Sequence, residues 1–204
     1  LLTAIAFLST RVQSPTEDDE KKLWRVLNFL NSSKDKQLLL KPDQGICVSA
    51  YVDASHAVHT ERRSHTGVVI QIGEATVSCN SMSTKQKLVS ISSTEAELIA
   101  VSEALPTILW LRNFLIALGY DVPPAKLYQD NMSTIALIKK GGSTSSRTRH
   151  IDIRYFFVSD RIASGEIEVE YCPTEKMLAD ILTKALQGKL FQTLSDAVMS
   201  SVST

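Results

Sequence analysis

Four carboxylates lie where the predicted strands and helices of this chain begin or end: Asp53, Glu97, Asp130 and Asp180. Asp53 closes a run rich in valine, isoleucine and tyrosine, which is typical of a buried strand, so its carboxylate is expected at the rim of a sheet. Carboxylates that meet at one point repel each other unless a cation holds them, and hard divalent cations prefer oxygen ligands. Two such ions can activate water and stabilise the leaving oxygen of a phosphodiester. The acids together therefore indicate a metal site.

Each of these acids also has a purely structural interpretation. Glu97 ends a Thr-x-x-Glu sequence that fits the capping box of a helix start, and Glu95 could equally be the acid that matters. Asp130 could cap the helix that follows it, and Asp53 could begin an Asx-turn. Asp180 is predicted in the middle of a helix between apolar pairs, where a solvated acid is unexpected. The metal-site hypothesis depends on all four acids jointly.

The apolar periodicity predicts an α/β fold. A strand over residues 46–53 is followed by a hairpin of two strands, 66–72 and 75–81. The later elements are a helix at 94–118, a strand at 126–129, helices at 132–140 and 150–163, a strand at 166–172 and a helix at 174–186. Three antiparallel strands followed by alternating helices and strands predict a mixed five-stranded sheet with helices on both faces.

A helical segment precedes this α/β region. Ser14-Pro15-Thr16 interrupts it, and the acidic residues 17–20 favour the start of a second helix. We predict a helical segment at 1–43, an α/β domain at 44–188 and a flexible C-terminal tail at 189–204. Because the chain begins without Met, we interpret it as a fragment of a longer protein.

Composition restricts the possible classes of protein. The chain has 204 residues, of which 44% are hydrophobic, enough for one domain with an appendage. Basic and acidic residues both number 22, so any nucleic-acid binding depends on a local patch. Cys47, Cys79 and Cys172 are odd in number and lack CxxC spacing, which favours reduced thiols in an intracellular protein. No segment is expected to span a membrane.

The four acids lie within a series of short motifs along the chain. These motifs are Tyr51-Val52-Asp53-Ala54, Arg63-Ser64-His65-Thr66-Gly67, Lys85-Gln86, Ser92-Ser93-Thr94-Glu95-Ala96-Glu97, Trp110-Leu111-Arg112, Asp130-Asn131, Arg147-Thr148-Arg149-His150-Ile151-Asp152 and Ala179-Asp180-Ile181-Leu182-Thr183-Lys184. Over residues 46–186 the series resembles the ribonuclease H domain of copia-type retrotransposon polyproteins. Residues 1–40 resemble the chain that follows the polymerase in such polyproteins.

The resemblance implies a ribonuclease H-like fold in which Asp53, Glu97, Asp130 and Asp180 are the catalytic acids and bind two Mg²⁺ ions, with Mn²⁺ as a possible substitute. It implies hydrolysis of the RNA strand of RNA:DNA hybrids, with the polymerase portion of the polyprotein as a partner. The expected location is a cytoplasmic particle, the nucleus, or both. One departure is the loop before the last acid, where Glu175 is a weak substitute for the His that many ribonucleases H carry.

Basic residues between the acids form a candidate track for the phosphates of a duplex. With the neighbouring amide Asn131, they are Lys85, Lys87, Arg147, Arg149 and Arg154. A local stripe can bind a polyanion even at zero net charge. The alternative is a solvated helix face, in which His150 is a helix-start residue rather than a metal ligand.

Two other functions remain open from the sequence. The first is another nuclease on the same fold, of the integrase or resolvase type. Glu97, in the first helix after three strands, argues against the three-acid pattern of integrases. The second is a non-catalytic connection or tethering domain of the polyprotein, which the presence of all four acids disfavours.

Overall fold

A single mixed sheet is the centre of the computed structural model, which describes residues 1–40, 45–55, 64–82, 92–140 and 149–199. Its strands, in the order β3-β2-β1-β4-β5, are β3 (Ala75–Met82), β2 (His65–Ile72), β1 (Val48–Ser55), β4 (Ala125–Gln129) and β5 (Ile167–Tyr171). Strands β1 to β3 pair antiparallel, whereas β4 is parallel to β1 and to β5. The predicted mixed five-stranded sheet is confirmed.

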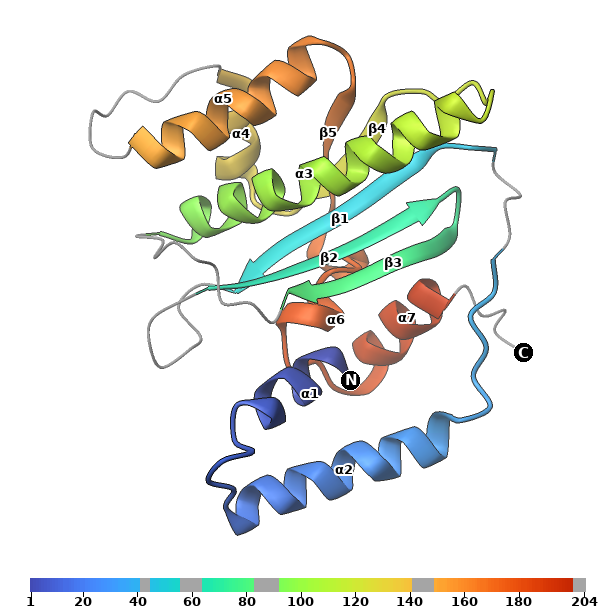
Figure 1. Ribbon diagram of the computed structural model, residues 1–204, viewed down its shortest axis with the longest axis vertical. Coiled ribbons are helices and arrows are strands. Elements are labelled where there is room, and N and C mark those ends of the chain that lie inside the picture. The colour runs from blue at the N-terminus through green and yellow to red at the C-terminus, as the bar shows by residue number, and fades with distance from the viewer. Residues whose placement is uncertain (41–44, 56–63, 83–91, 141–148, 200–204) are drawn as a thin grey trace.

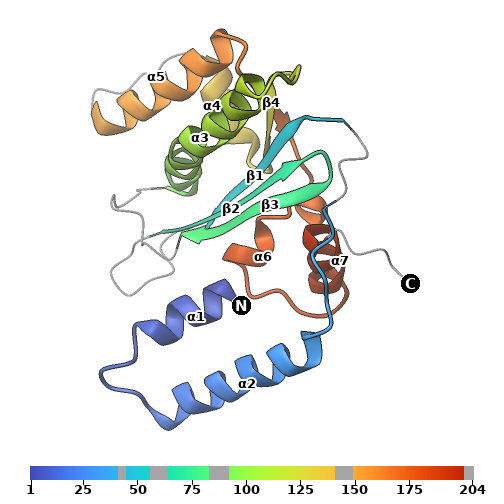
Figure 2. The same cartoon turned by 45° about the vertical axis from the view of Figure 1, so that its right-hand side comes forward.

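Helices cover both faces of the sheet, as Figures 1 and 2 show. One face packs on α3 (Ser93–Ala117), α4 (Met132–Lys140) and α5 (Arg149–Ala163), which share the main hydrophobic core with the strands. The opposite face carries α6 (Asp180–Thr183) and α7 (Gly188–Met199). The sheet therefore lies between two helical layers, as the sequence predicted.

Side-chain alternation along β1 determines which face each residue serves. Val48, Ala50 and Val52 belong to the core beneath α3, whereas Tyr51 packs in the clusters on the α6 side. Successive side chains of a strand point to opposite faces, so Asp53 follows Tyr51 toward α6. The carboxylate of Asp53 thus points toward α6 in the C-terminal part of the chain, rather than into the core beneath α3.

Helix α3 is the central helix of this core. Among the described helices, it is the one whose length and composition would also suit a membrane crossing. Its residues Leu98, Leu105 and Ile108 are fully buried against the sheet and the neighbouring helices. Burial of a broad apolar surface explains this composition, because a core helix also needs one.

The segment before Lys184 differs from the single helix predicted at 174–186. A 3₁₀ turn, η1 (Thr174–Lys176), is followed by an extended Met177 and the short helix α6. Met177 and Ala179 are fully buried with Cys172 under the sheet, and this packing interrupts the helix. Asp180 consequently begins a helix instead of lying in the middle of one, which corrects the prediction.

The C-terminal residues also differ from the prediction of a flexible tail from residue 189. Residues 188–199 form α7, in which Leu194 is buried. Leu190, Leu194 and Val198 are four residues apart, so they share one face of the helix and pack against the outer face of the sheet. Because an apolar row at this spacing is the pattern of an amphipathic helix, the sequence did contain the signal.

The N-terminal helices lie beyond α6 and α7, farthest from α3 (Figure 1). They are α1 (Leu2–Ser9) and α2 (Glu17–Ser33), the second beginning with a capping box between Thr16 and Asp19. The ring centroid of Phe29 in α2 is 6.0 Å from that of Phe191 in α7. Thr3 donates a hydrogen bond of 2.9 Å to the carbonyl of Leu182. The predicted division at residues 43 and 188 stays a prediction.

Gly67 on β2 permits α6 to approach the sheet closely. It pairs with Asp53 across the β1–β2 ladder. A Cβ atom at this position would lie 2.7 Å from Cγ2 of Thr183 and 3.0 Å from the carbonyl oxygen of Ala179. Any larger residue must therefore displace the helix that carries Asp180.

We expect Gly67→Ala to lower the free energy of unfolding by about 1–3 kcal/mol, because overpacking forces neighbouring atoms to move. Thr183→Ser removes Cγ2 and keeps the hydroxyl, so Gly67→Ala should cost less in that background. Urea unfolding of the four proteins of this double-mutant cycle measures the difference. An equal cost in both backgrounds would contradict the predicted contact.

Candidate metal centre

Three of the four predicted acids meet at one edge of the sheet. Asp53 is on β1, Asp130 directly follows β4, and Asp180 is the first residue of α6. Because β1 and β4 are parallel neighbours, their carboxyl ends reach the same edge. One carboxylate oxygen from each of the three lies within 4.8 Å of the others. Asp53 and Asp180 are also almost completely buried, at 2% and 0% exposure.

Glu97 joins the same site from the opposite face of the sheet. Its Oε1 accepts a hydrogen bond of 3.2 Å from the backbone N–H of Ala54, and its Oε2 accepts one of 3.1 Å from Nε2 of Gln129. These two donors are the neighbours of Asp53 and Asp130 in sequence. Glu97 is therefore fixed beside the three aspartates, although it is not one of the closely spaced group.

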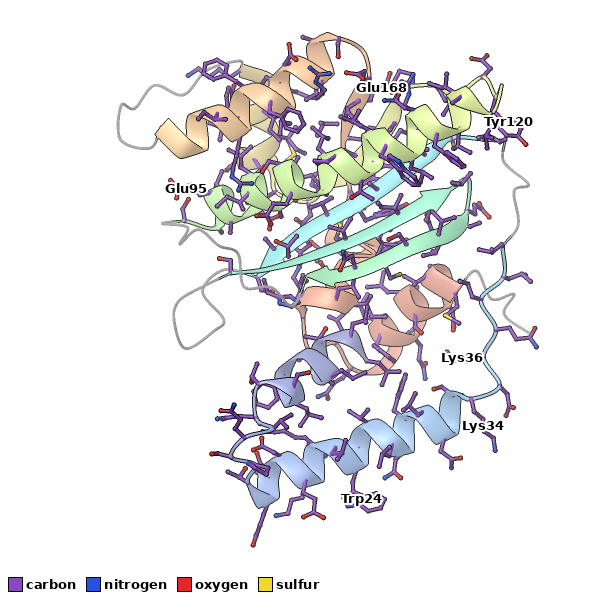
Figure 3. All side chains as sticks on the ribbon, in the orientation of Figure 1. Trp24, Lys34, Lys36, Glu95, Tyr120 and Glu168 are labelled. Atoms are coloured by element: carbon purple, nitrogen blue, oxygen red, sulfur yellow. The ribbon has the colours of Figure 1, made fainter. Side chains whose placement is uncertain are left out.

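At the N-terminus of α3, Glu95 and Glu97 have different surroundings. The N-cap is Ser92, whose hydroxyl accepts a hydrogen bond from the N–H of Glu95. Glu97 is buried and directed to the sheet, so it does not act as the capping-box acid. Figure 3 shows Glu95 at the outer start of α3. The choice of Glu97 over Glu95 agrees with this arrangement.

The structural interpretations of Asp53 and Asp130 do not match their surroundings. Asp53 lies within the paired part of β1, so it does not begin an Asx-turn. The cap of α4 is Asn131, whose Oδ1 accepts hydrogen bonds from the N–H groups of Ser133 and Thr134 at 3.0 and 3.2 Å. The Asp130 carboxylate is consequently left to the site, while Asn131, a predicted nucleic-acid contact, is used in the cap.

Gln129 connects Glu97 to the strand end, and the sequence analysis missed this role. Its side chain is fully buried. Besides donating to Glu97, it accepts hydrogen bonds from the N–H groups of Asp130 and Asn131, at 2.8 and 3.1 Å through Oε1. The available signal was a polar residue at a buried position of the β4 alternation, because such a residue needs internal partners.

Two residues after Asp180 complete the surroundings of the aspartates. The hydroxyl of Thr183 donates a hydrogen bond to Oδ2 of Asp53. The Lys184 ammonium lies 2.7 Å from Oδ1 of Asp180 and 3.8 Å from both Oδ1 of Asp53 and Oδ2 of Asp130. Both residues belong to the motif at 179–184, and their contacts with the aspartates were not predicted from the sequence.

Burial and mutual repulsion raise the pKa values of Glu97, Asp130 and Asp180. Burial, followed by the charge of Asp53, raises the pKa of Glu97 to about 9. Burial raises the pKa of Asp180 to about 6 against the opposing hydrogen bond from Lys184. Burial and the charge of Asp53 also raise the pKa of Asp130. The site without metal therefore retains protons that exposed carboxylates would lose.

The donor set fits a hard divalent cation. All the converging groups are carboxylates, and oxygen is the ligand atom that Mg²⁺ and Mn²⁺ prefer. Oδ2 of Asp180 is buried and accepts no hydrogen bond from any residue that the structure describes. A buried carboxylate oxygen without a donor is costly in a protein interior, and a cation would remove that cost.

Most of the predicted phosphate contacts lie outside the described part of the chain. Lys85, Lys87 and Arg147 lie outside the described residues, and so does the side chain of Arg149, although its backbone begins α5. Arg154 bridges α5 to α3, with Nη1 2.6 Å from the hydroxyl of Ser102 and Nη2 3.7 Å from Glu103. A phosphate contact by Arg154 would compete with these bonds.

Comparison with known proteins relates this chain to a segment of larger polyproteins. The retrovirus-related Pol polyprotein from transposon RE2 of Arabidopsis thaliana is 34% identical over 194 residues, which are 94% of this chain and 13% of the relative. The corresponding polyprotein from transposon TNT 1-94 of Nicotiana tabacum is 29% identical over 196 residues, or 96% of this chain and 14% of its own length. No family model matches the chain.

Among solved structures, LC11-RNase H1 isolated from compost aligns with a TM-score of 0.51 and 16% identity, over 68% of this chain and 93% of its own. At this identity the likeness shows the fold alone. The molecule is thus an α/β protein of the ribonuclease H fold. It is homologous to one segment of the Pol polyproteins of copia-type transposons, of which it spans only a small part.

The raised pKa of Asp180 predicts a pH-dependent effect of Asp180→Asn on stability in EDTA. The unfolded chain titrates this group near about 3.9, whereas the folded protein titrates it at about 6. The stabilisation from proton binding is complete below the unfolded pKa and is lost as the pH rises through the folded pKa. Wild type loses this stabilisation and the variant does not. The free energy of unfolding of the variant, relative to that of wild type, should therefore rise by about 2 kcal/mol as the pH increases from 4 to 7. Urea unfolding at both pH values measures this gain.

The control is Asp121→Asn, which changes an exposed aspartate outside the site. It should show no comparable change relative to wild type between the two pH values. A difference between Asp180→Asn and wild type that stays constant with pH would contradict the assigned environment of Asp180.

Proposed function

We propose that this chain is a metal-dependent endonuclease that hydrolyses the RNA strand of RNA:DNA hybrids as part of a retrotransposon Pol polyprotein. The observation that carries the proposal is the convergence of Asp53, Asp130 and Asp180 within 4.8 Å, with Glu97 hydrogen-bonded beside them. The ribonuclease H fold and the homology to transposon Pol polyproteins support the same function.

The four carboxylates are the residues that would hold the metal. We propose two Mg²⁺ ions, with Mn²⁺ able to replace them, bound by Asp53, Glu97, Asp130 and Asp180. When bound, the ions would supply Lewis-acid stabilisation of the phosphodiester oxygens and lower the pKa of the attacking water. The carboxylates themselves supply the negative charge and the fixed geometry that retain the ions.

The surrounding polar residues keep the carboxylates in position before substrate arrives. Gln129 fixes Glu97 and the backbone that leads into Asp130. Thr183 orients Asp53 through its hydroxyl group. Since these donors are already in place, little reorganisation is needed when charge develops on the reacting phosphate.

Substrate selection would depend on shape and sugar chemistry rather than base sequence. Recognition of an RNA strand relies on 2′-hydroxyl groups and A-form backbone geometry. We keep Lys85, Lys87, Asn131, Arg147, Arg149 and Arg154 as the proposed nucleic-acid contacts. The polymerase portion of the same polyprotein is the proposed protein partner, and a cytoplasmic particle or the nucleus the proposed location.

Asp53→Asn and Asp130→Asn should each lower hybrid cleavage at least about 100-fold, a loss typical of removing one group that stabilises developing charge. The assay uses a hybrid with an end-labelled RNA strand in Mg²⁺, and the cut should leave a 3′-hydroxyl end on the RNA. Double-stranded DNA of the same sequence should not be cut.

Glu97→Gln and Glu95→Gln form a matched pair, because they make the same change two positions apart at the start of one helix. Glu97→Gln should lose most activity, and Glu95→Gln should stay close to wild type. The reverse ranking would show that Glu97 was wrongly assigned to the site in place of Glu95. Wild-type activity in both Asp53→Asn and Asp130→Asn would refute the proposed function itself.

A further inference from the structure

Lys184 is a cation already present among the clustered aspartates. It follows the last residue of α6, four positions after Asp180. Its ammonium makes its shortest contact, 2.7 Å, with Asp180, and it lies 3.8 Å from both Asp53 and Asp130. In the part of the chain that the structure describes, Lys184 supplies every ion pair to these three acids. One flexible side chain therefore contacts all three.

Lys184 places a positive charge where the three aspartates repel each other. The three aspartates come together with most of their surface removed from water, so their repulsion is weakly screened. An ammonium on a lysine stem is a compact charge that offsets this repulsion without fixed geometry. Its contacts use Oδ1 of Asp180, and among the described residues no donor reaches the buried Oδ2 of the same residue. One ammonium consequently satisfies the acids only in part.

The Lys184 side chain also has a route away from the acids. Its side chain is 38% exposed, whereas those of Asp53 and Asp180 are only 3% and 1% exposed. A lysine at the border of a buried site can turn its charged end into water while its stem stays on the surface. The acids have no such freedom, because α6 and β1 hold them.

We propose that Lys184 is a built-in counter-ion of the metal-free site, which holds the three aspartates together and turns out to solvent when a divalent cation binds. This inference rests on the proposed function, because it presumes that the acids bind a metal. It makes Lys184 a positioning residue that competes with the ion. Removing its charge therefore lowers the stability of the metal-free protein and raises its affinity for the metal ion.

The test compares wild type with Lys184→Met, which keeps most of the stem and removes the charge. Isothermal titration calorimetry with Mg²⁺ alone, at constant ionic strength, should show about twofold to fivefold tighter binding by the variant, a range typical of losing a partly exposed charge contact. In EDTA, the variant should melt about 2–4 °C below wild type. Lys184→Gln should behave in the same way and serves as the second neutral variant.

Two controls separate this role from others. Lys176→Met removes an exposed positive charge from the preceding turn η1, and it should leave both Mg²⁺ affinity and melting in EDTA close to wild type. Lys184→Arg keeps the charge and should not tighten Mg²⁺ binding. A purely structural role for Lys184 would weaken Mg²⁺ binding or leave it unchanged in the neutral variants, because nothing would be displaced.

The outcomes also separate this proposal from the proposed function. If wild type binds Mg²⁺ and both neutral variants bind it equally or more weakly, the counter-ion proposal is overturned and the proposed function stands. If Lys184→Arg tightens binding as much as Lys184→Met, the charge is not responsible and the proposal is likewise overturned. If no variant and no wild-type protein binds Mg²⁺, the proposed metal-dependent function fails first.

Discussion

Electrostatic repulsion between buried carboxylates is the constraint on which the arrangement of this molecule depends. Asp53 and Asp180 are almost fully buried, and Asp130 and Glu97 lie beside them. Like charges at such distances in a weakly polar interior oppose folding unless protons, an ammonium or a metal offset them. Burial first, and then this repulsion, raises the pKa values of Glu97 and Asp180. The ion pairs of Lys184 offset the same repulsion.

The sheet brings the acids together from its two faces. Glu97 approaches from α3 and accepts its hydrogen bonds at the sheet edge, whereas Asp180 approaches from α6 on the opposite side. The close approach of α6 requires the missing side chain at Gly67, which pairs with Asp53 in the ladder. Packing between β2 and α6, directly beside the carboxylates, thus affects their separation, and small changes in that packing should alter the site.

Sequence patterns were sufficient for the strands and for α3, because strand composition and helix periodicity are local properties. They also selected the four acids that the structure brings to one edge of the sheet, whose roles stay a prediction. They failed where tertiary packing decides. Burial of Met177 interrupts the helix expected around Asp180. The prediction of a flexible tail in place of α7 is a different error, because the apolar row of this helix is a local pattern that the sequence contains. The hydrogen bond from Gln129 to Glu97 and the ion pair between Lys184 and Asp53 join residues from different elements, so no local pattern identifies these partners.

The most direct test of the central claim is a crystal structure of the wild-type protein grown with Mn²⁺, which gives anomalous scattering. We expect an anomalous peak within coordination distance of carboxylate oxygens from Asp53, Asp130 and Asp180, with the Lys184 ammonium turned away from them. No peak at this edge of the sheet at saturating Mn²⁺, with Lys184 still paired to Asp180, would contradict the claim that these acids form a shared metal site.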